Sequence, residues 1–410
     1  MIKSSKPKYF YGYIIVLATF IIMTMIVGGF NSFGVFFGPL VTEFDWSRGI
    51  TSGSFSLTLA LSGFLGIVVG KINDRFGPRL VLTVGGLLLC LGYLMLSQIN
   101  SIWQLYLYYG FILGTGLSAY VVPLLSTTAR WFVKRRGKMT GLVLAGVGTG
   151  TIIIPLMATW LVNNYGWRTS FLAIAILSLV FTIIPAQFLR RDPQRSKLLP
   201  DGDTSTTNGL NIKDEPGLSF RKAAHTKQIW MLSAIYFCLG FSIFAIIVHI
   251  VIHAIGQGLS SSDAATVLAI SGALNVGSRA VMGNVSDKIG NRPVLIIGIV
   301  TLMVALAWLQ FAKESWTLYL FGAVFGLAYG STIVTESPIV AEFFGLRAHG
   351  VLFGIVDVGF TTGGTVGPVL IGYLFDITSS YQLGFLIMAA MSLIGLIFTL
   401  LLRPIKKEVT

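Results

Sequence analysis

The sequence contains little charge and few residues that bind metals or form disulfides. Of its 410 residues, 11% are Asp, Glu, Lys or Arg, four are His and two are Cys. A soluble domain carries about 25% charged residues, so this composition excludes an ordinary soluble protein. The sequence shows no metal-ligand cluster and no Ser-His-Asp set at a matched depth. We therefore expect no metal, no cofactor and no enzymatic activity.

Long hydrophobic runs are what the sequence has in abundance, and hydrophobic residues make up 54% of it. About twelve runs are long enough to cross a hydrocarbon core of ~30 Å as helices, and none has the period of two of a barrel strand. These runs cover residues 12–38, 50–70, 79–98, 103–127, 139–162, 168–189, 229–255, 263–284, 293–312, 317–341, 351–374 and 381–402. The sequence thus predicts an all-α membrane protein with twelve transmembrane helices. Cys90 and Cys238 are expected to be small buried apolar residues in two of them.

The basic residues follow a pattern that indicates topology. Nearly all of the 29 Lys and Arg share one side of the membrane when both termini are placed in the cytoplasm, with clusters at 71–79, 130–138 and 190–227. The opposite loops hold Arg48, Arg168 and Lys313. This bias is the positive-inside rule, so the net charge of +13 reports orientation rather than a nucleic-acid partner. We expect a plasma-membrane protein with both termini cytoplasmic.

An internal repeat at an offset of 213 residues divides the chain into two halves. The segment GKINDRFGPR, which begins at Gly70, matches GNVSDKIGNR, which begins at Gly283. Farther along, four glycines and a proline match, namely Gly137, Gly141, Gly146, Gly150 and Pro155 with Gly350, Gly354, Gly359, Gly363 and Pro368. We predict an N-terminal six-helix bundle over 1–190, a polar cytoplasmic linker over 191–228 and a C-terminal six-helix bundle over 229–410.

The repeated loop motif carries a resemblance to a known family. The segment GKINDRFGPR around Asp74 resembles the signature loop of the major facilitator superfamily, whose architecture also has two six-helix halves with a long central loop. In physical terms Gly77 suits a tight turn, and the Asp74 carboxylate can accept from the amides of a helix N-terminus. The resemblance implies the major facilitator fold and a monomeric secondary transporter.

A second, narrower resemblance lies in residues 131–150, WFVKRRGKMTGLVLAGVGTG. This segment is similar to the sequence that leads into the fifth helix of monocarboxylate transporters, and it departs from that pattern at Trp131, Lys138 and Met139. The residues that fit are Phe132, Lys134, Arg135, Arg136, Gly141, Ala145 and Gly146. The motif that opens the first helix in that family is absent here, and the oxalate/formate antiporters are a neighbouring alternative.

Arg279 is the candidate binding residue, because it interrupts an otherwise apolar segment. A charge at the bilayer centre costs about 2.5–3.5 kcal/mol on insertion scales. Ser271, Asn275 and Arg279 follow one another at intervals of four and share one stripe of the predicted helix. The repeat aligns Arg279 with Gly66, so the charge is not part of the duplicated packing. Snorkelling of the side chain to the membrane surface is the structural alternative.

A single guanidinium matches a single carboxylate, which accepts two parallel hydrogen bonds from it. We therefore predict a small monocarboxylate such as L-lactate or pyruvate as the substrate, carried with a proton through the lipid bilayer by alternating access. Monocarboxylate transporters have an Asp four residues before this Arg and a Lys on the first helix, and here Asn275 and Asn31 occupy those positions. That resemblance therefore implies substrate binding by Arg279, and the family's Lys–Asp proton relay does not carry over. An organic-anion exchanger of the oxalate/formate antiporter type is the alternative function.

Further polar and aromatic residues complete the predicted site. The substrate-binding residues are expected to be Arg279, Asn275, Tyr120, Asn31, Tyr329 and Phe360. The candidates for proton coupling are His249, Asp357 and Glu336. For the tyrosines, for Phe360 and for His249 the alternative is packing, and for the two carboxylates it is structural pairing.

Overall fold

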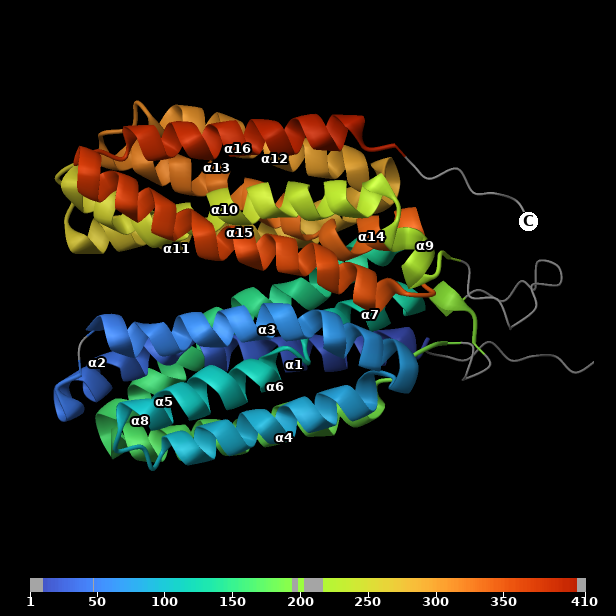
Figure 1. Cartoon of the computed structure of the whole chain (residues 1–410), viewed down its shortest axis with the longest axis horizontal. Coiled ribbons are helices and arrows are strands. Elements are labelled where there is room, and N and C mark those ends of the chain that lie inside the picture. Colours follow the sequence, from blue (N-terminus) through green and yellow to red (C-terminus); the bar gives the residue numbers. More distant parts are fainter. Residues whose placement is uncertain (1–9, 47, 194–197, 203–216, 404–410) are drawn as a thin grey trace, which may run out of the picture. The chain divides into compact units, whose positions relative to one another are not determined.

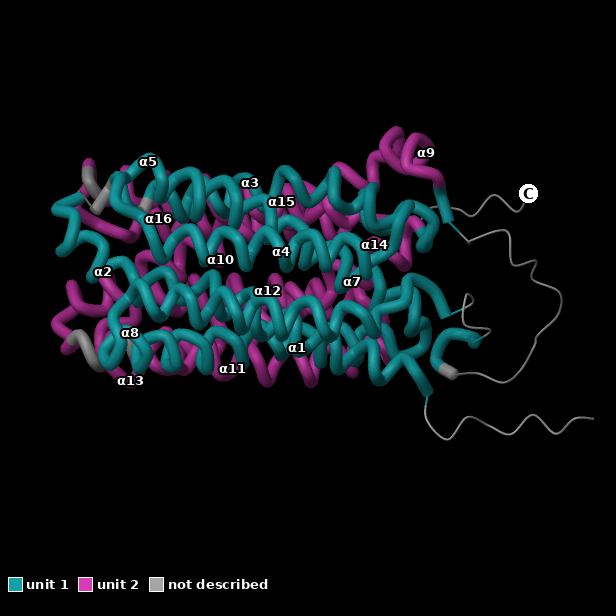
Figure 2. Tube along the Cα trace, turned by 90° about the horizontal axis from the view of Figure 1, so that it is seen from below, with its two compact units in different colours: residues 1–218, 345–351 teal, residues 219–344, 352–410 magenta. Residues whose placement is uncertain are grey.

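The computed structural model describes residues 10–46, 48–193, 198–202 and 217–403. These residues form helices and connecting turns, with a single isolated β-bridge between Gly217 and Gly345. The chain forms two compact units, which are coloured separately in Figure 2. Unit one comprises Met1–Leu218 and Gly345–Val351, and unit two comprises Ser219–Phe344 and Leu352–Thr410. The bounds 1–190, 191–228 and 229–410 remain a sequence prediction.

Unit one consists of helices of different lengths, and the longer ones run side by side (Figure 1). They are α1 (Gly12–Asn31), α2 (Phe33–Phe44), α3 (Arg48–Phe76), α4 (Pro78–Leu96), α5 (Ile102–Leu105), the π-helix η1 (Tyr106–Leu113), α6 (Gly114–Leu117), α7 (Val121–Trp131), α8 (Arg136–Phe188) and the 3-10 turn η3 (Pro200–Gly202). Within α8 the backbone at Gly166 has φ 76° and ψ 163°, which is not helical. A glycine tolerates this conformation, so α8 consists of two consecutive spans.

Unit two is also a bundle of helices. They are α9 (Phe220–Ala224), α10 (Lys227–Gly256), α11 (Ser261–Ile289), α12 (Asn291–Leu309), α13 (Ser315–Ile333), α14 (Glu336–Phe344), α15 (His349–Thr378) and α16 (Gln382–Leu401). The start of α15, up to Val351, belongs to unit one. Ten stretches of the described residues are long and apolar enough to cross a membrane. The stretch containing α8 counts once among them, and α11 is long enough but too polar to be included. With α8 divided and α11 added, the twelve predicted segments are all helical, which confirms the predicted fold class.

The two halves share the same close helix contacts. A methyl group added at Gly150 would collide with the backbone carbonyl of Thr24, and one added at Gly363 would collide with that of Phe237. Both members of the second pair lie 213 residues after those of the first. The same relation holds for a further set, Gly146 with Phe20 and Gly359 with Ser233. The repeat seen in the sequence is therefore a repeat of packing, between α1 and α8 in one half and between α10 and α15 in the other.

The signature loops also adopt one conformation twice. Gly77 has φ 88° and precedes α4, and its counterpart Gly290 has φ 92° and precedes α12. Residues with a side chain rarely adopt such positive φ values. The predicted role of these glycines in tight turns between consecutive helices is confirmed.

Candidate functional site

Arg279 belongs to α11 in unit two and is buried. Ten residues, or about 15 Å of helix, separate it from the end of α11 at Ile289. The side chain is 4% exposed, and Ser271, Asn275 and Ser278 on the same helix are also buried. The polar stripe of α11 therefore faces protein, and Arg279 does not face lipid as the snorkelling alternative would require.

Tyr329 of α13 lies against the guanidinium of Arg279. The guanidinium carbon is 5.4 Å from the centroid of the Tyr329 ring, and the two side chains also share a hydrogen bond and interact electrostatically. This geometry is a cation–π contact. Three of the residues predicted for the substrate site, Arg279, Asn275 and Tyr329, thus belong to one pair of neighbouring helices.

Glycines on α13 allow this approach. A methyl group at Gly326 would collide with the backbone of Ser271, and one at Gly330 would collide with the backbone of Asn275 and with Ser278. The Ser278 hydroxyl also donates to the carbonyl of Leu327, at 2.7 Å. Small residues let helix backbones approach closely in membrane proteins. The sequence of α13 therefore brings Tyr329 to the depth of Arg279.

The remaining predicted substrate residues are on other helices. Phe360 on α15 packs against Phe244 of α10, with 5.5 Å between the ring centroids. Asn31 and Tyr120 belong to unit one: Asn31 is exposed and donates to the hydroxyl of Thr151 at 2.9 Å, and Tyr120 is half-buried where α7 begins. The participation of these three residues in a substrate site stays a prediction.

Two carboxylates of unit two lie close together. Glu336, the first residue of α14, is 4% exposed, and no described residue hydrogen-bonds its Oε1. Asp357 of α15 is half-buried and interacts electrostatically with Glu336. The buried Tyr236 also interacts electrostatically with Glu336, and its hydroxyl lies 3.1 Å from that of Thr335. The sequence did not indicate Tyr236, because a tyrosine within an apolar segment is most often a packing residue.

His249 bridges three elements. Its Nε2 lies 2.9 Å from the carbonyl oxygen of Pro368 on α15, and its Nδ1 lies 3.3 Å from the hydroxyl of Tyr381 at the start of α16. A carbonyl oxygen only accepts, so Nε2 carries a hydrogen and a neutral ring accepts at Nδ1. Both ring nitrogens are thus engaged in holding α10 to its neighbours. Proton coupling by His249 stays a prediction that this geometry does not favour.

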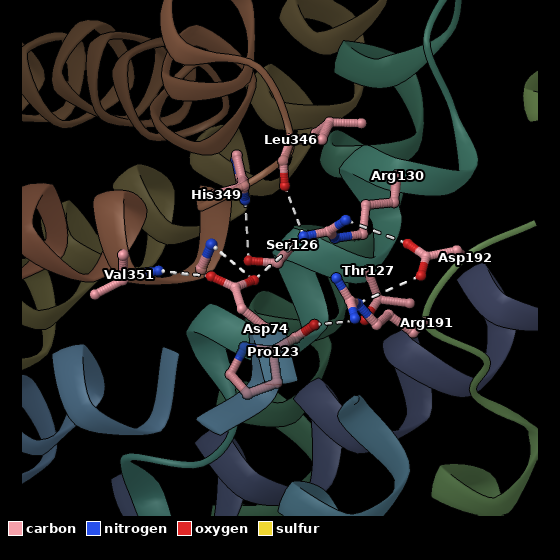
Figure 3. A network of polar contacts seen from close by, with 11 residues as sticks. Asp74, Pro123, Ser126, Thr127, Arg130, Arg191, Asp192, Leu346, His349 and Val351 are labelled. Carbon is pink, nitrogen blue, oxygen red and sulfur yellow. Dashed lines mark hydrogen bonds and ion pairs between the residues drawn. The ribbon is translucent and has the colours of Figure 1, made fainter. Parts of the chain in front are cut away.

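A polar network in unit one surrounds Arg130 (Figure 3). The side chain of Arg130 is 3% exposed; its Nη2 lies 3.2 Å from Oδ1 of Asp74, and its Nη1 lies 3.2 Å from Oδ1 of Asp192. Nη2 also donates to the carbonyl of Leu346 at 2.6 Å. The sequence grouped Arg130 with a cytoplasmic basic cluster and did not indicate that its side chain is buried in an ion-pair network.

Asp74 also accepts from a helix N-terminus. The amides of Gly350 and Val351, in the first turn of α15, donate to its two oxygens at 3.3 Å (Figure 3). The predicted role of Asp74 as an acceptor for such amides is confirmed. The buried His349 beside them was missed, because a histidine next to a loop gives no sequence signal of burial.

The comparisons with known proteins agree with this architecture. The model of the Major Facilitator Superfamily matches residues 19–284 and 278–410. The chain belongs to this superfamily, and it is therefore a transporter rather than an enzyme.

Its relatives include several monocarboxylate transporters. Monocarboxylate transporter 13 of Rattus norvegicus is 27% identical over 96% of this chain and 89% of its own length. Monocarboxylate transporter 11 of Homo sapiens is 28% identical over 96% of this chain and 83% of its own length. Among solved structures, the proton:xylose symporter XylE is similar in fold, with a TM-score of 0.76, 15% identity and 96% of each chain covered.

Proposed function

We propose that the chain transports small monocarboxylates such as L-lactate or pyruvate together with a proton, by alternating access. The observation that carries this proposal is the buried guanidinium of Arg279 beside the Tyr329 ring. The similarity to proteins named monocarboxylate transporters supports the same substrate class.

The chemistry of Arg279 selects the substrate class. A guanidinium donates two parallel hydrogen bonds to one carboxylate, and its plane is oriented when it lies against an aromatic ring. Asn275, one turn before Arg279 on the same helix, supplies an amide for a hydroxyl or carbonyl group next to the carboxylate. The predicted membrane segments of the second half contain no other Lys or Arg, so a dianion would lack a second cation there.

A proton is expected to accompany the anion. A membrane potential that is negative inside opposes anion uptake by about 2.3 kcal/mol per charge per 100 mV, and a co-transported proton cancels this cost. We assign the proton to Glu336 and Asp357, because two carboxylates near each other, one buried and one half-buried, are costly to ionise together. Their electrostatic contact and the unpartnered Oε1 of Glu336 among the described residues support this assignment.

The test is uptake of labelled L-lactate into proteoliposomes that contain the full chain. We expect an inward proton gradient to accelerate uptake, and a protonophore that collapses the gradient to return uptake to the rate measured without one. Arg279→Lys should lose uptake, because a point charge does not replace the planar fork. Arg221→Lys, an exposed change on α9, is the matched control and should transport normally. Counterflow between two anions without any response to pH would instead identify an organic-anion exchanger.

A further inference from the structure

Unit two contains a cavity at the ends of α10, α12 and α15. Its volume is about 450 Å³, within the range of small-molecule sites, about 300–1,000 Å³. The residues that line it come from α10, α12, α15, α16 and the turns next to them, and they include His253, Lys313, Phe375, Tyr381, Phe385 and three glutamines. None of them comes from α11 or α13, so this cavity is separate from Arg279 and Tyr329.

One wall of the cavity is a series of nearly parallel aromatic rings. Phe375 stacks on Tyr381 with 4.3 Å between the ring centroids and 23° between the planes, and Tyr381 lies at 6.0 Å and 17° from Phe385. His253 meets Phe385 edge-on, with 4.9 Å between centroids. The hydroxyl of Tyr381 is close to His249, so Tyr381 contributes mainly its ring to the wall. Such a wall suits a flat aromatic group.

The polar groups of the cavity favour an anion. Lys313 is exposed, the three glutamines supply amide donors, and the described lining contains no Asp or Glu. The adjacent carboxylate of Glu314 is engaged at the start of α13, where it accepts from the Trp316 indole at 2.6 Å. His253 has a buried Nε2 without a hydrogen-bond partner among the described residues, which leaves one further polar group unused.

We propose that this cavity binds an aromatic monocarboxylate, independently of Arg279. The carboxylate of the ligand lies near Lys313 and the glutamine amides, and its ring lies against Phe375, Tyr381 and Phe385. Small-molecule sites generally combine a mostly apolar lining with a few polar or charged groups, and this cavity has the same combination. Given the predicted orientation of the chain, the cavity opens to the outer side of the membrane.

The experiment is equilibrium binding of labelled phenylacetate to the full chain in lipid nanodiscs. Arg279→Lys disables the proposed transport site, and we expect one saturable phenylacetate site to persist in this variant. In that background, Lys313→Gln should weaken binding about tenfold, and Lys222→Gln, an exposed control on α9, should leave it unchanged. Acetate, which has the carboxylate without the ring, should compete at least tenfold more weakly than unlabelled phenylacetate.

Two outcomes would overturn the proposal. One is loss of all saturable binding in Arg279→Lys, which would assign phenylacetate to the transport site. The other is equal affinity of Lys313→Gln and its control. Phe385→Ala gives a second measurement, since loss of one ring should weaken phenylacetate severalfold while acetate competition stays the same. A failure of lactate uptake would leave these binding results unaffected, so the two proposals are tested separately.

Discussion

His349 and Ser126 are joined by a hydrogen bond although 223 residues separate them, with 3.0 Å between Nδ1 and the hydroxyl oxygen. Both residues are 0% exposed. This bond and the amides that donate to Asp74 attach the first turn of α15 to α7 and α3 within unit one. The start of one helix is thereby held by side chains from distant parts of the sequence.

Loss of the charge on Asp74 should destabilise the protein. Asp74→Asn leaves the buried guanidinium of Arg130 with one carboxylate in place of two, and breaking a buried pair costs about 3 kcal/mol. Glu43→Gln is the matched control, because its ion pair with Arg168 is 40–48% exposed and should contribute less than about 1 kcal/mol. Thermal unfolding in detergent measures both. Equal shifts in Tm would contradict the importance of the Arg130 network.

The hydroxyl of Ser126 is expected to contribute on its own. Ser126→Ala removes the partner of His349 Nδ1 in a buried site, which costs about 1–3 kcal/mol. Thr301→Ala removes an exposed hydroxyl that bonds only to its own helix at Ile297, and it should change stability little. The comparison uses the same unfolding assay, and a Ser126→Ala protein as stable as the Thr301→Ala protein would show that the bond contributes nothing.

Tyr329 should act on substrate affinity through its ring. Tyr329→Phe keeps the ring against Arg279, and lactate affinity should fall less than threefold. Tyr329→Leu removes the cation–π contact, worth about 1–2 kcal/mol when it is desolvated, and affinity should fall about 5- to 30-fold. Concentration dependence of uptake gives both values. Similar losses for Phe and Leu would mean that the hydroxyl, not the ring, orients the guanidinium.

The response of uptake to a proton gradient should differ between variants of Glu336 and of His249. Glu336→Gln should abolish uptake driven by a proton gradient while lactate counterflow persists, because the substrate site is intact and the proton site is not. His249→Gln should stay responsive to the gradient but lose about 1–2 kcal/mol of stability, since it removes a bridge to Pro368 and Tyr381. Gradient-driven uptake by Glu336→Gln at the normal rate would move the proton to another group.

Replacement of the duplicated glycines by alanine should destabilise the protein in both halves. Gly150→Ala and Gly363→Ala each place a methyl group against a backbone carbonyl of the neighbouring helix, which cannot move aside as a side chain can. Overpacking of this kind costs about 1–3 kcal/mol. Gly272→Ala on α11 has open space and should be neutral or slightly stabilising. Thermal unfolding of the three variants tests this, and tolerance in one half alone would show that the contacts are no longer equivalent.

Much of the fold was predictable, because the length of a membrane-spanning helix and the internal repeat both leave a visible pattern in the sequence. Apolar runs marked the helices, and the aligned glycines marked both the turns and the close contacts. The partners of Arg130 and His349 were not predictable, since contacts across 56 to 223 residues leave no periodic signal. At the candidate site, the stripe of Arg279 and Asn275 followed from helix geometry. The approach of Tyr329 depended on two glycines of α13 whose register against α11 only the structure shows.

The repeated packing has a practical consequence. The glycine contacts that hold the helices together occur in both halves, whereas the charged residue of the candidate site occurs in one. At Gly66, the counterpart of Arg279, an added methyl group would meet only a methyl group of Val122, at 3.9 Å, so the first half keeps the scaffold without the charge. Attempts to retune this transporter for a different cargo should therefore exchange α11 and α13 as a matched cassette. The glycines that make the close helix contacts in both halves should not be changed.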